Sequence, residues 1–167
     1  MAKNNKRKNP GYFERNAKQF GENFLSRKTA KDIKFDSRNI FKDIAHSDPE
    51  KDIPNIVEYF NNLTFVTNLS AAANEELIKN NAVFIGLQMY IAASQRGEVY
   101  IDPSQQLYEN MIMAQNKMYA YSIIYMHLNN ILSLFNYSGD DDWLKANIEM
   151  QLKSLSLQLS KYKYILN

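Results

Sequence analysis

The sequence contains no cysteine and little glycine or proline. Among 167 residues there are 5 Gly and 4 Pro. Without cysteine the chain forms no disulfide, uses no thiol nucleophile and holds no cysteine-bound metal, a composition typical of an intracellular protein. So few Gly and Pro leave little material for the tight turns of an all-β fold.

Signatures of catalysis, secretion and membrane insertion are also missing. There is no Gly-rich phosphate loop and no Gly-x-Ser-x-Gly nucleophile elbow, and the chain has only 2 His. No apolar run reaches the ~18 residues of a membrane span, and the basic N-terminus lacks the apolar segment of a signal peptide. We therefore expect no enzyme activity, no cofactor and no contact with a membrane.

The metal-ligand types present do not form a recognisable site. His127 lacks the Glu-x-x-His pairing of a di-iron bundle because residue 124 is Ile. Asp43 and His46 have helical i, i+3 spacing but stand alone. The remaining acidic groups are more typical of helix starts and solvated surface than of a site: Asp140–Asp142, Glu75–Glu76, and the single Glu58, Glu109 and Glu149. We expect no metal.

Residues 102–135 contain the strongest helix signal. Asp102 is a good N-cap, Pro103 suits the first helical position, and no Gly or Pro follows until Gly139. Apolar residues then step at heptad spacing through Leu107, Met111, Ala114, Met118, Tyr121, Tyr125, Leu128, Leu132 and Phe135, with a second stripe at Tyr108, Ile112, Tyr119 and Met126. A helix that is apolar on more than one side must be covered on more than one side.

Three further segments have helical patterns. The first runs from about Pro54 to Leu69. The second starts at a cap at Ser70 or Asn74, continues to about Gln95, and is ended by Arg96–Gly97; the Ala71–Ala73 run also allows both to form one kinked rod. Its apolar stripe is Ile78, Ala82, Ile85, Met89 and Ala92. The last follows Asp140–Asp142, with the stripe Ile148, Leu152, Leu155, Leu159, Tyr162 and Leu166. Short connections predict an all-α, up-and-down helical bundle of three to four long helices.

Charge divides the chain into a basic arm and an acidic body. Residues 1–42 hold 12 Lys/Arg against 4 Asp/Glu, whereas residues 43–167 hold 8 against 14. The Pro-containing turn at 47–54 predicts a boundary, so we assign 1–47 to an extended basic N-terminal arm with short helical anchors and 48–167 to the helical bundle domain. The anchors are Phe13, Phe20, Phe24, Phe35, Ile40 and Phe41. They either fold back on the parent body or dock on a partner subunit.

The first residues of the arm suggest another role. Lys3, Lys6, Arg7 and Lys8 are positioned to neutralise nucleic-acid phosphates, and aromatic residues follow that can stack on bases. DNA or RNA binding through the arm is therefore the alternative function. A helical regulator of a larger bacterial complex is a third interpretation.

The amino-acid bias and the organisation of the chain together favour a structural role. Asn (20), Lys (15), Ile (15) and Tyr (11) are abundant and Arg (5) is scarce, which is typical of an AT-rich genome. A helical body with a basic arm from such a genome resembles small virion proteins of tailed phages, such as a head–tail adaptor ring or an internal structural protein. The resemblance implies a homo-oligomer that also contacts other structural proteins, in the virion and the host cytoplasm.

Overall fold

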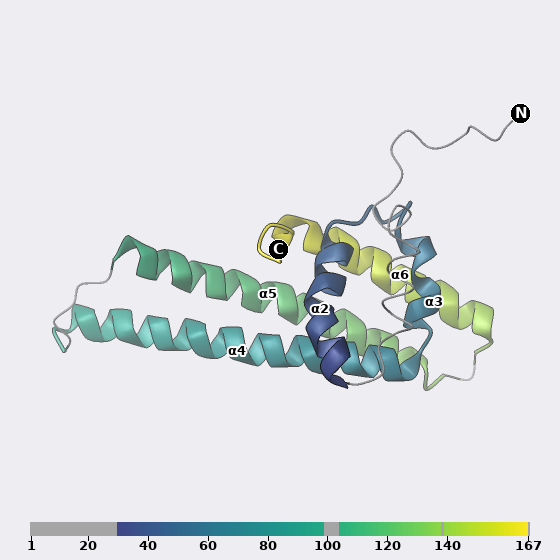
Figure 1. Cartoon of the computed structure of the whole chain (residues 1–167), viewed down its shortest axis with the longest axis horizontal. Coiled ribbons are helices and arrows are strands. Elements are labelled where there is room, and N and C mark those ends of the chain that lie inside the picture. Colours follow the sequence, from purple (N-terminus) through teal and green to yellow (C-terminus); the bar gives the residue numbers. More distant parts are fainter. Residues whose placement is uncertain (1–29, 99–103, 138, 167) are drawn as a thin grey trace, which may run out of the picture.

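The chain folds into helices throughout the part described by the computed structural model, which comprises residues 30–98, 104–137 and 139–166 (Figure 1). In chain order these are α2, η2, α3, α4, α5, α6 and η3, and no β-strand occurs among these residues. The all-α class predicted from the sequence is confirmed.

Two long helices, α4 (Leu63–Gln95) and α5 (Gln105–Leu134), form an antiparallel hairpin that runs the length of the molecule (Figure 1). Side-chain caps set both starts. The Asn62 side chain accepts from the Phe65 N–H at 3.0 Å, and Ser104 Oγ accepts from the Leu107 N–H at 3.2 Å. The described helix thus begins after Ser104 and not after the expected Asp102, which lies outside the described residues together with Pro103.

The predicted helix over residues 54–69 is wrong in its bounds. This stretch instead holds a 3₁₀ helix, η2 (Ile53–Asn55), and a short helix, α3 (Val57–Phe60), which is capped by Asn61. Helix α4 begins at Leu63. Asn62 is extended (φ −140°, ψ 109°) because it caps α4, and the Phe60 and Phe65 rings pack edge to face across this corner at 5.5 Å. The helix then passes through Ala71–Ala73 without a break, so Ser70 and Asn74 cap nothing.

Helix α6 (Asp141–Leu159) lies beside the second half of α5 and continues into η3 (Ser160–Tyr162) (Figure 1). Asp140 caps α6, since its Oδ1 accepts from the Trp143 N–H at 2.7 Å. The predicted stripe faces the core, with Ile148, Leu152, Leu155, Leu159 and Leu166 buried. Helices α4, α5 and α6 therefore form the predicted up-and-down arrangement.

Helix α2 (Ala30–Ala45) crosses the hairpin and also contacts α6 (Figure 1). Ile40, Phe41 and Ile44 are fully buried, and the Phe41 ring packs edge to face on Tyr121 at 6.1 Å. The prediction that Ile40 and Phe41 dock on a partner is therefore corrected: they fold back on the parent body, because their helix carries its apolar side onto the chain's own core.

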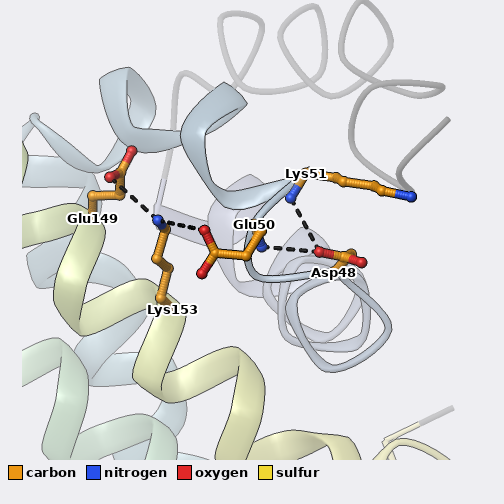
Figure 2. A network of polar contacts seen from close by, with 5 residues as sticks. All are labelled: Asp48, Glu50, Lys51, Glu149 and Lys153. Carbon is orange, nitrogen blue, oxygen red and sulfur yellow. Dashed lines mark hydrogen bonds and ion pairs between the residues drawn. The ribbon is translucent and has the colours of Figure 1, made fainter. Parts of the chain in front are cut away.

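The turn after α2 is tied to α6 by polar contacts (Figure 2). Asp48 Oδ1 accepts from the Glu50 and Lys51 N–H groups at 2.9 and 3.1 Å, and Lys153 Nζ lies 3.1 Å from Glu50 Oε2 and 3.6 Å from Glu149 Oε2. Beside this network the Ser47 and Ser156 hydroxyls are 2.7 Å apart. Residues 36–47, assigned to the arm from the sequence, thus share one packed unit with the residues after 48.

The core lies at one end of the hairpin. Its buried side chains come from α2, η2, α3, α6 and the halves of α4 and α5 nearest to Leu63 and Leu134. The other half, which ends at Gln95 and Gln105, extends beyond α2 and α6 (Figure 1). Between residues 81 and 113 the only described residue that is buried is Ile91.

Candidate functional site

The candidate metal ligands are dispersed in the structure. No group of three or more His, Asp or Glu side chains is placed to hold a metal ion within the described ranges. His127 is buried between α5 and α6, with its Nδ1 2.9 Å from Gln151 Oε1, while its Nε2 has no hydrogen-bond partner among the described atoms. His46 lies at the end of α2, next to the turn that begins at Ser47.

The acidic residues make caps and surface ion pairs. Asp140 caps α6, and Asp141 binds Lys145 at 2.9 Å and Asn61 at 2.9 Å, so the Lys145 hydrogen bond lowers the pKa of the Asp141 carboxyl. Lys145 also pairs with Glu58 at 2.6 Å. Glu75 and Glu76 lie in the middle of α4, which corrects their predicted place in a first helical turn.

Most of the predicted arm residues lie outside the described part of the chain. These are Lys3, Lys6, Arg7, Lys8, Phe13, Phe20 and Phe24. Phe35 falls within α2, but its side chain is not among those described. The docking and phosphate-contact predictions for these residues stay predictions.

Large apolar side chains are exposed along one side of the hairpin. The relative exposures are 61% for Ile78, 44% for Ile85 and 65% for Met89 on α4, and 51% for Ile112, 45% for Tyr119 and 48% for Met126 on α5. We call these six residues the hairpin face. Both stripes are apolar in the sequence, but no element of the described chain covers these six residues.

The two stripes flank one groove. Ile78, Leu77 and Asn81 of α4 line a shallow groove together with Met118, Tyr119 and Ser122 of α5. Because the helices are antiparallel, moving seven residues forward from Ile78 and seven back from Tyr119 reaches Ile85 and Ile112. Seven residues are about two helical turns, so this second pair lies on the same sides of its helices, nearer the hairpin tip.

The hairpin face also lacks the charges of a solvated helix surface. From Asn80 to Gln95 there is no Asp, Glu, Lys or Arg, and from Asn110 to Leu134 the only one is Lys117. Soluble helices normally carry charged residues on the side opposite their packed stripe. Exposed apolar surface of this kind is typical of interaction sites. None of the described helices is both long and apolar enough to cross a membrane.

The opposite side of the hairpin carries a basic pocket of about 380 Å³ where α2 crosses it. The cations that line it are Arg38 and Lys42 of α2, Lys79 of α4 and Lys117 of α5. Arg38 pairs with Glu76 at 2.8 Å, whereas the described residues supply no ion pair to the three lysines. Burial, with a smaller effect of the Glu76 charge, raises the pKa of Tyr121 in this pocket to about 12, so its phenol stays neutral.

Comparisons with protein-family models, with curated proteins and with solved structures found no match to this chain.

Proposed function

We propose that this protein is a non-enzymatic assembly subunit that associates with copies of itself through the hairpin face. The observation that carries the proposal is the pair of exposed apolar stripes at helical spacing on two helices that are poor in charge: residues 80–95 carry none, and residues 110–134 carry only Lys117. Heptad-spaced apolar side chains are the packing surface of helical bundles and coiled coils. Fully burying one such side chain is worth roughly 1.5–3 kcal/mol. Each subunit offers six that are 44–65% exposed, so an interface gains about half of that value from each.

Exposure of the hairpin face gives a direct test. Ile85 and Ile112 are 44% and 51% exposed, so the double variant Ile85→Glu with Ile112→Glu leaves the fold intact but places carboxylates where a partner packs. We expect the wild-type protein to show a mass that is a multiple of 19.5 kDa by light scattering. The measurement is made at ~50 µM, well above a dissociation constant near 1 µM, which corresponds to a binding free energy of about −8 kcal/mol. The variant should show one chain.

A matched control places the same charges elsewhere on the same two helices. Leu63→Glu with Asn110→Glu adds two carboxylates at exposed positions outside the hairpin face and should leave the wild-type mass unchanged. A monomeric wild type, or a hairpin-face variant that assembles normally, would contradict the proposal.

The amino-acid composition and the basic arm support a more specific function for the subunit. We propose that the assembly is part of a tailed-phage virion, either a head–tail adaptor ring or an internal structural protein. Electron microscopy of the purified protein checks this: closed rings are expected for an adaptor, and irregular aggregates would count against it.

The basic pocket favours a second candidate function, nucleic-acid binding. It gathers four cations, two from α2 and two from the hairpin, and its three lysines have no ion-pair partner among the described residues, which leaves them to contact phosphates. If nucleic acid binds here, replacing Lys42, Lys79 and Lys117 by Gln should weaken binding to a DNA duplex and flatten its salt dependence, whereas Lys161→Gln with Lys163→Gln should not. Equal salt slopes in both variants would exclude the pocket as the contact.

A further inference from the structure

The basic pocket, where α2 crosses the hairpin, is built by side chains at helical spacing on three helices. Arg38 and Lys42 are four residues apart on α2, and Lys117 and Tyr121 are four residues apart on α5. Residues at this spacing lie on the same face of a helix, one turn apart. Lys79 of α4 completes the set of cations. Each of the three helices therefore turns one polar face toward a shared concavity of about 380 Å³.

The charges around this pocket are not balanced by the residues that line it. Four cations and one carboxylate, that of Glu76, leave three positive charges. Glu76 Oε1 accepts from Arg38 Nη2 at 2.8 Å and from Arg38 Nε at 3.3 Å, so the carboxylate is already engaged by Arg38. Lys42, Lys79 and Lys117 form no ion pair within the described ranges. An anion in the pocket would relieve the repulsion among these three ammonium groups.

Tyr121 brings a hydrogen-bond donor without a partner to the same pocket. The residue is only 7% exposed, and its ring is held edge to face against Phe41 at 6.1 Å. Its hydroxyl group forms no hydrogen bond with any residue that the structure describes, and it is not fully enclosed by them, so it opens into the pocket that Tyr121 lines. Burial raises the pKa of Tyr121 to about 12, and the hydroxyl group therefore remains a donor at neutral pH.

The size and the donors of the pocket limit what can occupy it. Its walls come from α2, α4 and α5, with the apolar Ile165 and Leu166 at its border. A volume of about 380 Å³ is near the lower end of ligand pockets, which span roughly 300–1,000 Å³. Lysine and arginine are the usual partners of phosphate oxygens. Because one phosphate group carries roughly 1.5–2 negative charges, two adjacent groups match the three positive charges of the pocket.

We propose that the basic pocket binds a small ligand with two adjacent phosphate groups, held by Lys42, Lys79 and Lys117 and by a hydrogen bond from the Tyr121 hydroxyl. The diphosphate group is either free or part of an ester. This ligand rests on the same pocket as the nucleic-acid candidate above but is of a different class. In a nucleic-acid strand a sugar separates successive phosphates, whereas these donors gather around one concavity.

Titration calorimetry of the full chain with inorganic pyrophosphate tests the site. We expect saturable binding of one pyrophosphate per chain. Tyr121→Phe removes only the hydroxyl oxygen and should weaken binding about tenfold, the effect of one hydrogen bond to a charged group. Lys42→Gln with Lys117→Gln should weaken binding more strongly, because two charged donors are lost. The control, Lys161→Gln with Lys163→Gln, removes two cations outside the pocket and should keep the wild-type affinity.

The fold of each variant is checked by thermal melting. Tyr121→Phe should keep the wild-type melting temperature, because the hydroxyl group that it removes has no hydrogen-bond partner in the described part of the chain. Weaker binding by this variant at an unchanged melting temperature therefore reports on the ligand contact and not on folding.

The outcomes separate the diphosphate site from the other proposals. A wild type that does not bind pyrophosphate, or a Tyr121→Phe variant that binds as tightly as the wild type, overturns the site. Equal weakening in the control variant would assign the affinity to general surface charge, also against the site. If a DNA duplex binds through the pocket lysines but pyrophosphate neither binds nor competes, the small ligand is excluded and the nucleic-acid candidate stands.

A nucleoside diphosphate distinguishes the two sources of the ligand. Tighter binding than pyrophosphate, with the same loss in Tyr121→Phe, would support the site with an esterified ligand, and equal or weaker binding with that loss would support it with the free anion. Self-association through the hairpin face is measured separately by light scattering, so its failure leaves these results unchanged.

Discussion

Gly97 shows how one residue terminates the longest helix of the fold. Its φ of 73° lies in the left-handed region, and it is the only described residue with a positive φ. The Glu98 N–H donates to the Ala93 carbonyl at 3.0 Å and the Gly97 N–H to the Ser94 carbonyl at 3.1 Å, which is the Schellman pattern of a helix C-terminus. The expected C-cap at Arg96–Gly97 is confirmed.

Two Gly→Ala substitutions in and after α4 should have opposite effects on stability. At Gly97, a Cβ in the left-handed region costs about 1–2 kcal/mol. At Gly86, inside α4, a Cβ meets no atom within 4 Å, and Ala should stabilise by roughly 0.5–1 kcal/mol through its better helix propensity. Urea unfolding in the Ile85→Glu, Ile112→Glu background measures both without a contribution from association. If both substitutions changed the free energy of unfolding in the same direction, the end of α4 at Gly97 would not be held in the described conformation.

At the scale of elements, α5 has two apolar sides, one buried in the core and the other half exposed. Ala114, Tyr121, Ile124, Leu128 and Ile131 are buried against α4, α2 and α6, while Ile112, Tyr119 and Met126 are half exposed. The sequence pattern gave no means of ranking the two stripes, since both are apolar and both recur at heptad spacing. The connections and the positions of α2 and α6 decide which stripe the chain itself covers.

The two sides of α5 should respond differently to the same change. Leu128→Asp buries an uncompensated carboxylate in the core and should cost about 3–5 kcal/mol, enough to unfold a marginal domain. Met126→Asp, two residues earlier on the hairpin face, should change the fold little and reduce association instead. Thermal melting followed by circular dichroism, together with light scattering, checks both; equal melting of the two variants would show that the buried side is misassigned.

At the scale of the whole molecule, the core and the unpaired surfaces are separated. The core includes α2, which joins residues on both sides of the predicted 47/48 boundary into one packed unit, with the Asp48 turn and Lys153 fixing it to α6 (Figure 2). The hairpin continues beyond this core as two helices that cover only one side of each other. In the proposed assembly, contacts with further copies bury this remaining apolar surface.

The sequence by itself determined the helical class, the three long apolar stripes on α4, α5 and α6, and the caps at Asp140 and Gly97, because these depend on residues within a few positions of one another. It placed the break before α4 wrongly, although the Asn62 cap and the Phe60–Phe65 contact are also local, because the apolar pattern of residues 54–69 continues through Asn61 and Asn62 and hides the break. Only the tertiary structure decided that Ile40 and Phe41 belong to the chain's own core and that Ile78, Ile85 and Ile112 remain exposed. Periodicity identifies which residues share a face of a helix, but whether that face is covered depends on where distant segments pack.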